Sequence, residues 1–169
     1  LRMKQLLILG AGTAGTTMAS HLRKKLRKNE WKISIVDERK GHYYQPGFLF
    51  IPFGIYTPQQ TVKPIKKFIP KGVELVQDSI ELVKPEDNKV ILANGSHLLY
   101  DIMIIATGSD IAPEEVEGMK GAEWQKSVFD FYSYEGSVAL AEKLKNWEGG
   151  KLVEIFLKYI HHTRIFQLE

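Results

Sequence analysis

One stretch near the N-terminus restricts the folds open to this chain more than any other feature. An apolar run, residues 6–9, leads directly into Gly10, Gly12 and Gly15, and a helix-prone stretch follows. A second apolar run, residues 33–36, then ends on Asp37. This order of strand, Gly-x-Gly-x-x-Gly, helix, strand and acid, with about 20 residues between the last glycine and the acid, is the dinucleotide-binding fingerprint.

Each glycine of the fingerprint has a separate physical purpose. Gly10 allows the tight turn out of the strand, and Gly15 lets the helix pack closely on the sheet. Gly12 has no Cβ, so a pyrophosphate can approach the backbone, where the helix N-terminus offers unpaired N–H groups. The alternative is a glycine-rich turn without a ligand, but the strand before the motif and the acid after it favour a nucleotide site.

Composition excludes several function classes. The net charge of +3, from 23 basic and 20 acidic residues, is too small to indicate a nucleic-acid partner. The chain has no cysteine, which excludes disulfides, thiolate metal sites and thiol catalysis by this chain. No side-chain pattern indicates a catalytic group or a metal site. The basic cluster at 23–28 is interpreted as the solvated face of a helix whose buried stripe includes Leu22 and Leu26.

The sequence lacks the pattern of a membrane-spanning or secreted segment. No apolar run approaches the roughly 20 residues of a membrane span, and no secretory signal precedes the first strand. We therefore expect a soluble, cytoplasmic polypeptide.

The first half of the chain predicts a βαβ unit followed by a long loop. We expect a strand over 4–9, a helix over 14–28 and a strand over 32–37, with the two strands as parallel neighbours. Residues 38–60 have no regular period, although they are rich in Gly, Pro, Tyr and Phe, and a loop of this length is more often functional than not. A short helix is predicted over 61–68.

The second half predicts a β-meander and one more helix. Residues 73–76, 79–84, 89–92 and 98–99 have the pattern of short strands, and Asn94-Gly95 is a tight-turn signal. The apolar run within 100–109 suits a central parallel strand buried on both faces, and a helix is predicted over 134–147. The predicted fold class is α/β: a doubly wound parallel sheet, Rossmann-like as in FAD- and NAD-binding domains, with a β-meander crossover.

Taken together, these motifs resemble the N-terminal FAD domain of two-dinucleotide-domain flavoproteins. The residues that carry the resemblance are the glycine motif, Asp37-Glu38, the segment 42–54, the meander and Ala106-Thr107-Gly108. The chain is similar to sulfide:quinone oxidoreductases and to the flavoprotein subunit of flavocytochrome c sulfide dehydrogenase, within the FAD/NAD-linked pyridine nucleotide-disulfide oxidoreductase superfamily. The resemblance covers residues 3–150, and its most specific part is the segment 43–54.

The resemblance implies a set of FAD contacts. The glycine loop would hold the pyrophosphate, Asp37 would bond the adenosine ribose with Glu38 and Arg39 flanking it, and the backbone near Ser79 and Ile80 would contact the adenine. The 106–108 turn would pass the pyrophosphate and ribityl chain, and Gln45 and Pro46 would lie near the isoalloxazine ring. The full implied set is Gly10, Gly12, Thr13, Ala14, Gly15, Asp37, Glu38, Arg39, Gln45, Pro46, Ser79, Ile80, Ala106, Thr107 and Gly108.

Departures from the family pattern indicate a truncated protein. Family members are more than twice as long and carry a second nucleotide-like domain and a membrane-associating C-terminal segment. The sulfide-oxidising members also work through redox cysteines, and this chain has none. We therefore expect residues 3–150 to be a truncated FAD domain that is not catalytic alone. Residues 151–169 are expected to be a tail that is non-native or added for expression. The face left by the absent domain is expected to be apolar, which would favour self-association.

Three functions stay open from the sequence. The first is the FAD-binding part of an enzyme that passes electrons from sulfide through flavin to quinone, peripheral on a membrane in its intact form. The second is a type II NADH:quinone oxidoreductase-like flavoenzyme of the same fold. The third is a non-catalytic module that binds nucleotide weakly or only contacts a partner.

Overall fold

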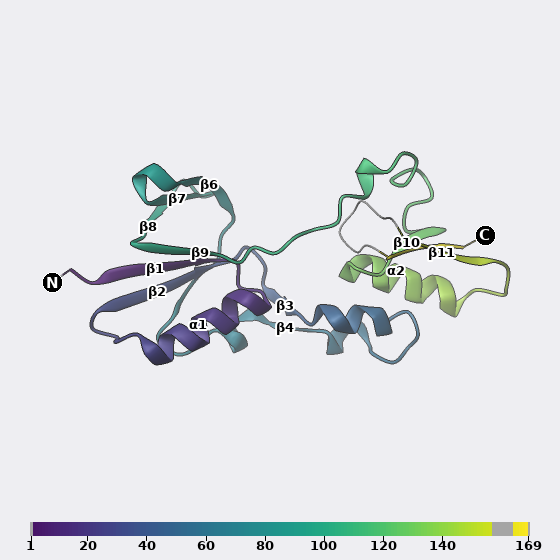
Figure 1. Cartoon of the computed structure of the whole chain (residues 1–169). Helices are drawn as coiled ribbons and strands as arrows, with labels where there is room; N and C mark the ends of the chain where they lie inside the picture. The colour runs from purple at the N-terminus through teal and green to yellow at the C-terminus, as the bar shows by residue number, and fades with distance from the viewer. Residues whose placement is uncertain (1, 157–163, 169) are drawn as a thin grey trace. The chain divides into compact units, whose positions relative to one another are not determined.

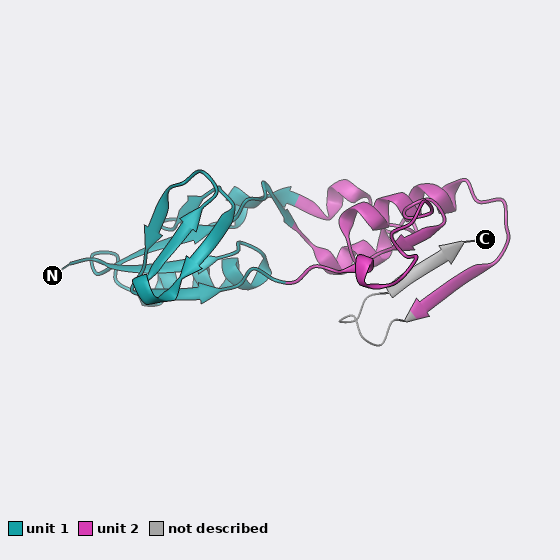
Figure 2. Ribbon diagram, turned by 90° about the horizontal axis from the view of Figure 1, so that it is seen from above, with its two compact units in different colours: residues 1–42, 63–108 teal, residues 43–62, 109–169 magenta. Residues whose placement is uncertain are grey.

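The computed structural model describes residues 2–156 and 164–168 and divides the chain into two compact units. Unit 1 contains residues 1–42 and 63–108, and unit 2 contains residues 43–62 and 109–169 (Figure 2). The chain leaves unit 1 and returns to it near a short two-stranded sheet of β3 (Gly41–Tyr43) and β4 (Val62–Pro64). Each unit is described separately below.

Unit 1 is built on a four-stranded parallel sheet. Its strands are β1 (Lys4–Leu9), β2 (Trp31–Val36), β5 (Glu74–Val76) and β9 (Ile102–Ile105), in the order β5-β2-β1-β9. Helix α1 (Thr13–Lys25) connects β1 to β2, which pair in parallel from Lys4 with Trp31 to Leu9 with Val36. This is the predicted βαβ unit, and the parallel sheet confirms the predicted α/β class.

Side-chain alternation along β1 separates two apolar cores. Leu6 and Ile8 point to the side covered by α1. There they form one cluster with Ala19 of the helix and with Ile33 and Ile35 of β2. Leu7 and Leu9 point to the other side and cluster with Val90 and Leu92. A strand that is apolar at every position is therefore buried on both faces, which is the usual condition of a central parallel strand. Figure 1 shows α1 and the meander on opposite faces of this sheet.

The second face is covered by the predicted β-meander. Strands β6 (Ile80–Lys84), β7 (Lys89–Leu92) and β8 (His97–Leu99) form an antiparallel sheet. A short 3₁₀ turn, η4 (Pro85–Asp87), separates the first two strands, and the predicted tight turn at Gly95, which has a φ of +81°, separates the last two.

Three predicted elements of unit 1 differ from the structure. Residues 61–68 form β4 and the 3₁₀ turn η3 (Ile65–Phe68) where one helix was predicted, because Pro64 has no N–H and adopts an extended conformation. The strand near 73–76 joins the parallel sheet beside β2 and is not part of the meander. Strand β9 lies at the sheet edge with Ile102 and Ile105 exposed, so the prediction of a central strand buried on both faces was wrong.

Helix α1 also ends earlier than predicted, at Lys25, and its basic cluster is only partly solvated. Arg23 is 9% exposed, which contradicts the interpretation of the whole cluster as a solvated face. Its guanidinium donates to the carbonyls of Leu26, at 2.5 Å, and Trp31, at 3.2 Å. These contacts give the buried guanidinium acceptors at the end of α1 and at the start of β2.

In its described residues, unit 2 contains one α-helix, short 3₁₀ turns and an antiparallel sheet. Helix α2 (Tyr134–Lys145) confirms the predicted helix, and its N-cap Ser133 accepts a hydrogen bond from the Gly136 amide. Phe129, Phe131 and Leu140 form its core. The remaining elements are η1 (Gln45–Phe50), η2 (Pro58–Gln60), η5 (Pro113–Glu115), β10 (Val128–Asp130), β11 (Leu152–Phe156) and β12 (Arg164–Leu168).

The predicted tail contributes two strands to unit 2. β11 and β12 pair in antiparallel, and β12 also pairs with β10. The non-native or expression-derived origin of 151–169 stays a prediction.

Candidate functional site

The glycine loop between β1 and α1 is closely packed at two of its three glycines. Gly10 has a φ of +94°, and a Cβ placed on it would lie 2.3 Å from the Ala106 carbonyl oxygen. A Cβ on Gly15 would lie 1.8 Å from the Gly10 carbonyl oxygen. Both separations are far below van der Waals contact, so the fold itself requires glycine at these two positions.

Gly12 differs from the other two glycines of the motif. It is the N-cap of α1 with a φ of −71°, a conformation open to any residue, and a Cβ on it would meet nothing within 4 Å. Neither packing nor backbone conformation therefore requires glycine here. The open space lies at the N-terminus of a 13-residue helix, where N–H groups and the helix dipole favour an anion.

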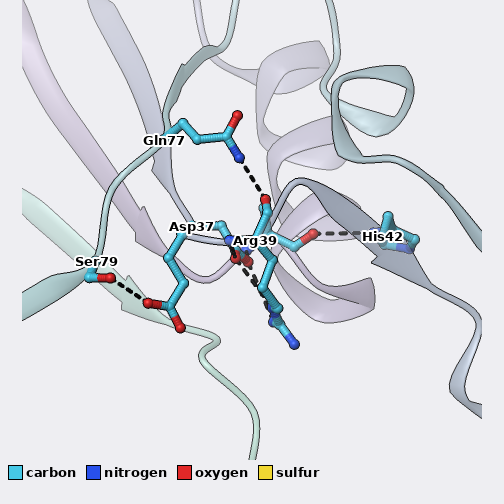
Figure 3. A network of polar contacts seen from close by, with 7 residues as sticks. Asp37, Arg39, His42, Gln77 and Ser79 are labelled. Atoms are coloured by element: carbon cyan, nitrogen blue, oxygen red, sulfur yellow. Dashed lines mark hydrogen bonds and ion pairs between the residues drawn. The ribbon is translucent and has the colours of Figure 1, made fainter. Parts of the chain in front are cut away.

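Asp37 is a buried carboxylate that holds the loop from the end of β2. Its side chain is 4% exposed. One oxygen accepts a hydrogen bond from the Ala11 amide at 2.7 Å, and the other accepts from the Arg39 amide at 2.9 Å (Figure 3). The Arg39 guanidinium adds an ion pair at 3.3 Å. Asp37, the residue predicted to bond the ribose, therefore lies at the loop. Its carboxylate already accepts hydrogen bonds from two backbone amides.

A second polar contact joins the end of β2 to the link between β5 and β6. The Ser79 hydroxyl donates to the Glu38 carboxylate. The side-chain Nε2 of Gln77 donates to the backbone carbonyl of Arg39 at 2.7 Å (Figure 3). The sequence placed Glu38 beside the ribose and the Ser79 backbone near the adenine of one adenosine site, and the structure shows that the two side chains are in contact. Ile80, the other residue predicted near the adenine, begins β6 beside Ser79. Gln77 was missed, because a carboxamide in a loop carries no pattern of its own.

His42 contacts the same loop residue as Asp37, at its carbonyl group. Its Nδ1 lies 3.2 Å from the Ala11 carbonyl oxygen, and its ring stacks on Phe68 with 4.1 Å between centroids. A carbonyl oxygen can only accept, so Nδ1 carries the hydrogen in this contact. Both contacts are those of a residue that anchors the loop.

The 106–108 turn lies beside the start of the glycine loop. The Ala106 amide donates to the Leu9 carbonyl at 2.7 Å, so the turn continues directly from the pairing of β9 with β1. Thr107 and Gly108 are exposed, and Gly108 has a φ of +77°. The structure thus brings together two motifs that stand almost a hundred residues apart in the sequence.

Two predicted site residues lie elsewhere in the fold. Gln45 and Pro46 begin η1 in unit 2 and are both exposed. All other residues predicted to contact FAD lie in unit 1. Thr13 and Ala14 are exposed in the first turn of α1.

Within residues 2–156 and 164–168, no cluster of three or more His, Asp or Glu side chains has a geometry suited to a metal ion. None of the helices in this part of the chain combines the length and apolar character needed to cross a bilayer.

Comparison with known proteins points to one family. The profile of the family described as pyridine nucleotide-disulphide oxidoreductase matches residues 4–152. The mitochondrial sulfide:quinone oxidoreductase of Dictyostelium discoideum is 34% identical over 148 residues, covering 88% of this chain and 32% of that protein. A type II NADH:quinone oxidoreductase of Staphylococcus haemolyticus is 27% identical over 123 residues, covering 72% of this chain and 30% of that protein.

A solved structure has the same fold. The sulfide:quinone oxidoreductase of Aquifex aeolicus superposes with a TM-score of 0.69 at 24% identity, covering 84% of this chain and 32% of that chain. This chain therefore spans about a third of the length of the relatives that it matches.

Proposed function

Because this chain belongs to the pyridine nucleotide-disulphide oxidoreductase family, we propose that unit 1 binds the adenosine and pyrophosphate parts of FAD. The observation that carries the proposal is Gly12. The protein's own packing requires Gly10 and Gly15, whereas at Gly12 it leaves open space against the N-terminus of α1. A glycine that the fold does not need is explained by a ligand that must approach the backbone closely.

The other roles follow from the contacts of unit 1. The amides of Thr13, Ala14 and Gly15 are in the first turn of α1 and would donate to phosphate oxygens. Asp37 and the Glu38–Ser79 pair lie at the ends of β2 and of the 77–79 link, where the ribose and adenine are expected. Arg39, Ile80 and the 106–108 turn would line the remaining adenosine and pyrophosphate contacts. Gln45 and Pro46 keep their predicted place near the isoalloxazine ring as part of this proposal.

For the complete protein we propose a sulfide:quinone oxidoreductase-like flavoprotein of which this chain is the N-terminal part. The similarity to the Dictyostelium enzyme supports this choice. FAD supplies the electron-transfer chemistry, and the contribution of this chain is to bind and orient the adenosine end. Since the chain has no cysteine, the sulfur chemistry that passes electrons from sulfide to flavin and on to quinone must use groups outside it.

The proposal extends to location and partners. The sequence predicts a cytoplasmic chain, whereas the Dictyostelium relative is named as mitochondrial. For the complete protein we therefore propose a peripheral association with a quinone-containing membrane. The proposed self-association is supported by exposed apolar side chains in unit 2, of which Phe53 and Ile55 are 60% and 63% exposed.

The test is a titration of the purified chain with FAD, followed by flavin fluorescence, with NADH as a parallel ligand. Saturable FAD binding that is weakened in Asp37→Ala supports the proposal. A folded chain that binds neither nucleotide contradicts it and favours the non-catalytic module. For the complete protein, flavin reduction by NADH and not by sulfide would favour the second candidate, a type II NADH:quinone oxidoreductase. The similarity to the Staphylococcus haemolyticus protein supports this candidate.

A further inference from the structure

Unit 1 contains a pocket whose lining residues, Gln77 excepted, have no place in the proposed nucleotide site. It has a volume of about 390 Å³ and lies where η3 and the turn after it meet β5. Its walls combine two lysines with apolar side chains, and the lining residues are Lys66, Ile69, Pro70, Lys71, Gly72, Val73, Leu75 and Gln77. A surface depression of this size that combines cationic groups with apolar side chains has room for a small anionic ligand.

The segment that leads into this pocket is rich in lysine, and the next acid along the chain, Glu74, is paired with Lys32 at 2.9 Å. The sequence from Gly41 to Val73 contains no Asp or Glu, and Lys66 and Lys71 both fall within it. Neither lysine takes part in an ion pair among the residues that the structure describes. A third ammonium group is close, since Lys28 Nζ would lie 3.9 Å from a Cβ placed on Gly72.

A buried cation lies behind the same wall. Arg23 is 9% exposed, and its Cδ would lie 3.6 Å from a Cβ on Gly72. Its terminal nitrogens donate to backbone carbonyls, its Nε has no hydrogen-bond partner within the described part of the chain, and no carboxylate there pairs with it. Burying a charge without a counter-charge is costly, and an anion in the adjacent pocket would reduce that cost.

We propose that this pocket binds a phosphate ester. The ammonium groups of Lys66 and Lys71 would donate charge-assisted hydrogen bonds to the phosphate oxygens, and the Arg23 charge would stabilise the anion from behind the wall. The apolar residues Ile69, Val73 and Leu75 would contact the carbon skeleton. A phosphate ester fits better than a simple anion because the pocket offers both a cationic rim and an apolar wall. This site is separate from the glycine loop and goes beyond the proposed FAD function.

The first test is an NMR titration of the ¹⁵N-labelled chain with glycerol 3-phosphate in a constant sodium chloride background. We expect saturable shifts at the amides of residues 66 and 71–73. The variants Lys66→Gln and Lys71→Gln should each weaken binding at least about tenfold, the loss expected for one charge-assisted hydrogen bond. Lys126→Gln, an equal charge change on an exposed lysine of unit 2, is the matched control and should bind normally.

A second arm identifies the source of the ester. Sedimentation is measured with phosphatidylcholine vesicles that contain phosphatidic acid, and with phosphatidylcholine vesicles alone. Binding of glycerol 3-phosphate, of the phosphatidic acid vesicles or of both, each lost in the double variant Lys66→Gln/Lys71→Gln, supports the site and tells a soluble ester from a lipid headgroup. Shifts confined to residues 12–15, shifts that do not saturate, or equal loss in the Lys126 control overturn it. FAD affinity of the double variant should be unchanged, so failure here is distinguishable from failure of the proposed function.

Discussion

The two glycines at the start of α1 predict opposite consequences when each gains a side chain. Gly12→Ser places a side chain in open space at the helix N-cap, whereas Gly15→Ala drives a methyl group to 1.8 Å from the Gly10 carbonyl oxygen. We expect the first change to weaken FAD binding strongly in a protein that stays stable. The second should destabilise the fold itself.

The magnitudes follow from these contacts. Serine is a good N-cap residue and the Gly12 φ of −71° suits it, so Gly12→Ser should change the free energy of unfolding by less than about 0.5 kcal/mol. If its side chain prevents two phosphate–amide hydrogen bonds, each about 1.5 kcal/mol, FAD affinity should fall about a hundredfold or more. Gly15→Ala forces the backbone of the loop to move, which should cost about 3 kcal/mol and lower the Tm by roughly 6–12 °C.

The assay pairs thermal unfolding, followed by circular dichroism, with FAD titration for the wild type and both variants. The expected result separates the two effects: Gly12→Ser melts with the wild type and binds FAD about a hundredfold more weakly, while Gly15→Ala melts early. Wild-type FAD affinity in Gly12→Ser would refute the assignment of the open space to a pyrophosphate. An unchanged Tm in Gly15→Ala would refute the close packing of the loop.

Three further changes test other parts of the structure. Asp37→Ala leaves the Ala11 amide without its acceptor and should lower the free energy of unfolding by about 1–3 kcal/mol, measured by urea titration. A hydrogen bond from Lys32 lowers the pKa of Glu74 below its ordinary value of 4.5. The ionised Glu74 carboxylate therefore stabilises the folded chain above pH 4.5, and this contribution is lost as the pH falls and the carboxylate is protonated. Because this pair is half exposed, Glu74→Gln should cost well under about 1 kcal/mol at pH 7, with the difference from wild type vanishing at low pH in urea titrations. Ser133→Ala removes the N-cap of α2 and should cost about 1 kcal/mol, whereas Ser127→Ala, a surface hydroxyl bonded to Glu123, should be nearly neutral by the same measurement.

The fold of unit 1 could be predicted from the sequence where local chemistry and packing agree. The β1–α1–β2 unit follows from a continuous apolar run, a glycine motif and a second apolar run, and Asn94-Gly95 fixed the hairpin between the last meander strands. In both cases the residues that determine the geometry lie within a few positions of each other. The boundaries of α1 were less accurate, because its C-terminus depends on the Arg23 contact with the Leu26 carbonyl.

Errors arose where a residue's environment depends on distant segments. The run 102–105 is as apolar as β1, yet β9 has a strand neighbour on one side only among the described residues, so Ile102 and Ile105 are exposed. An apolar run cannot tell a central strand from an edge strand, because strand order is set by the whole sheet. Arg23 was misjudged for a related reason: its acceptors belong to the helix end and to β2, and a charge pattern on one helix does not reveal them.

The candidate site shows the same division between local and distant information. The residue types at 10, 12, 15 and 37 were recognisable from spacing alone, and the structure brings the glycine loop and Asp37 together. The contact between Glu38 and Ser79 depends on how β5 leads into β6, and the sequence placed the two residues near one ligand without predicting that they touch. The spacing of these residues therefore predicted a dinucleotide ligand. The contacts among the surrounding side chains could be seen only in the folded structure.

Ala11 contacts both residues that anchor the glycine loop, through its backbone amide and carbonyl groups. Its amide donates to Asp37 and its carbonyl accepts from His42, so the peptide groups on either side of it are held by residues from the end of β2 and from β3. The next residue is Gly12, whose following amides face the open space at the start of α1. Two anchors on one peptide segment fix the direction of those amides before any ligand arrives, which reduces the ordering cost of binding. The acid of the fingerprint therefore acts through the loop backbone as well as through any ribose it contacts, and its loss should affect the phosphate and the ribose ends of the site together.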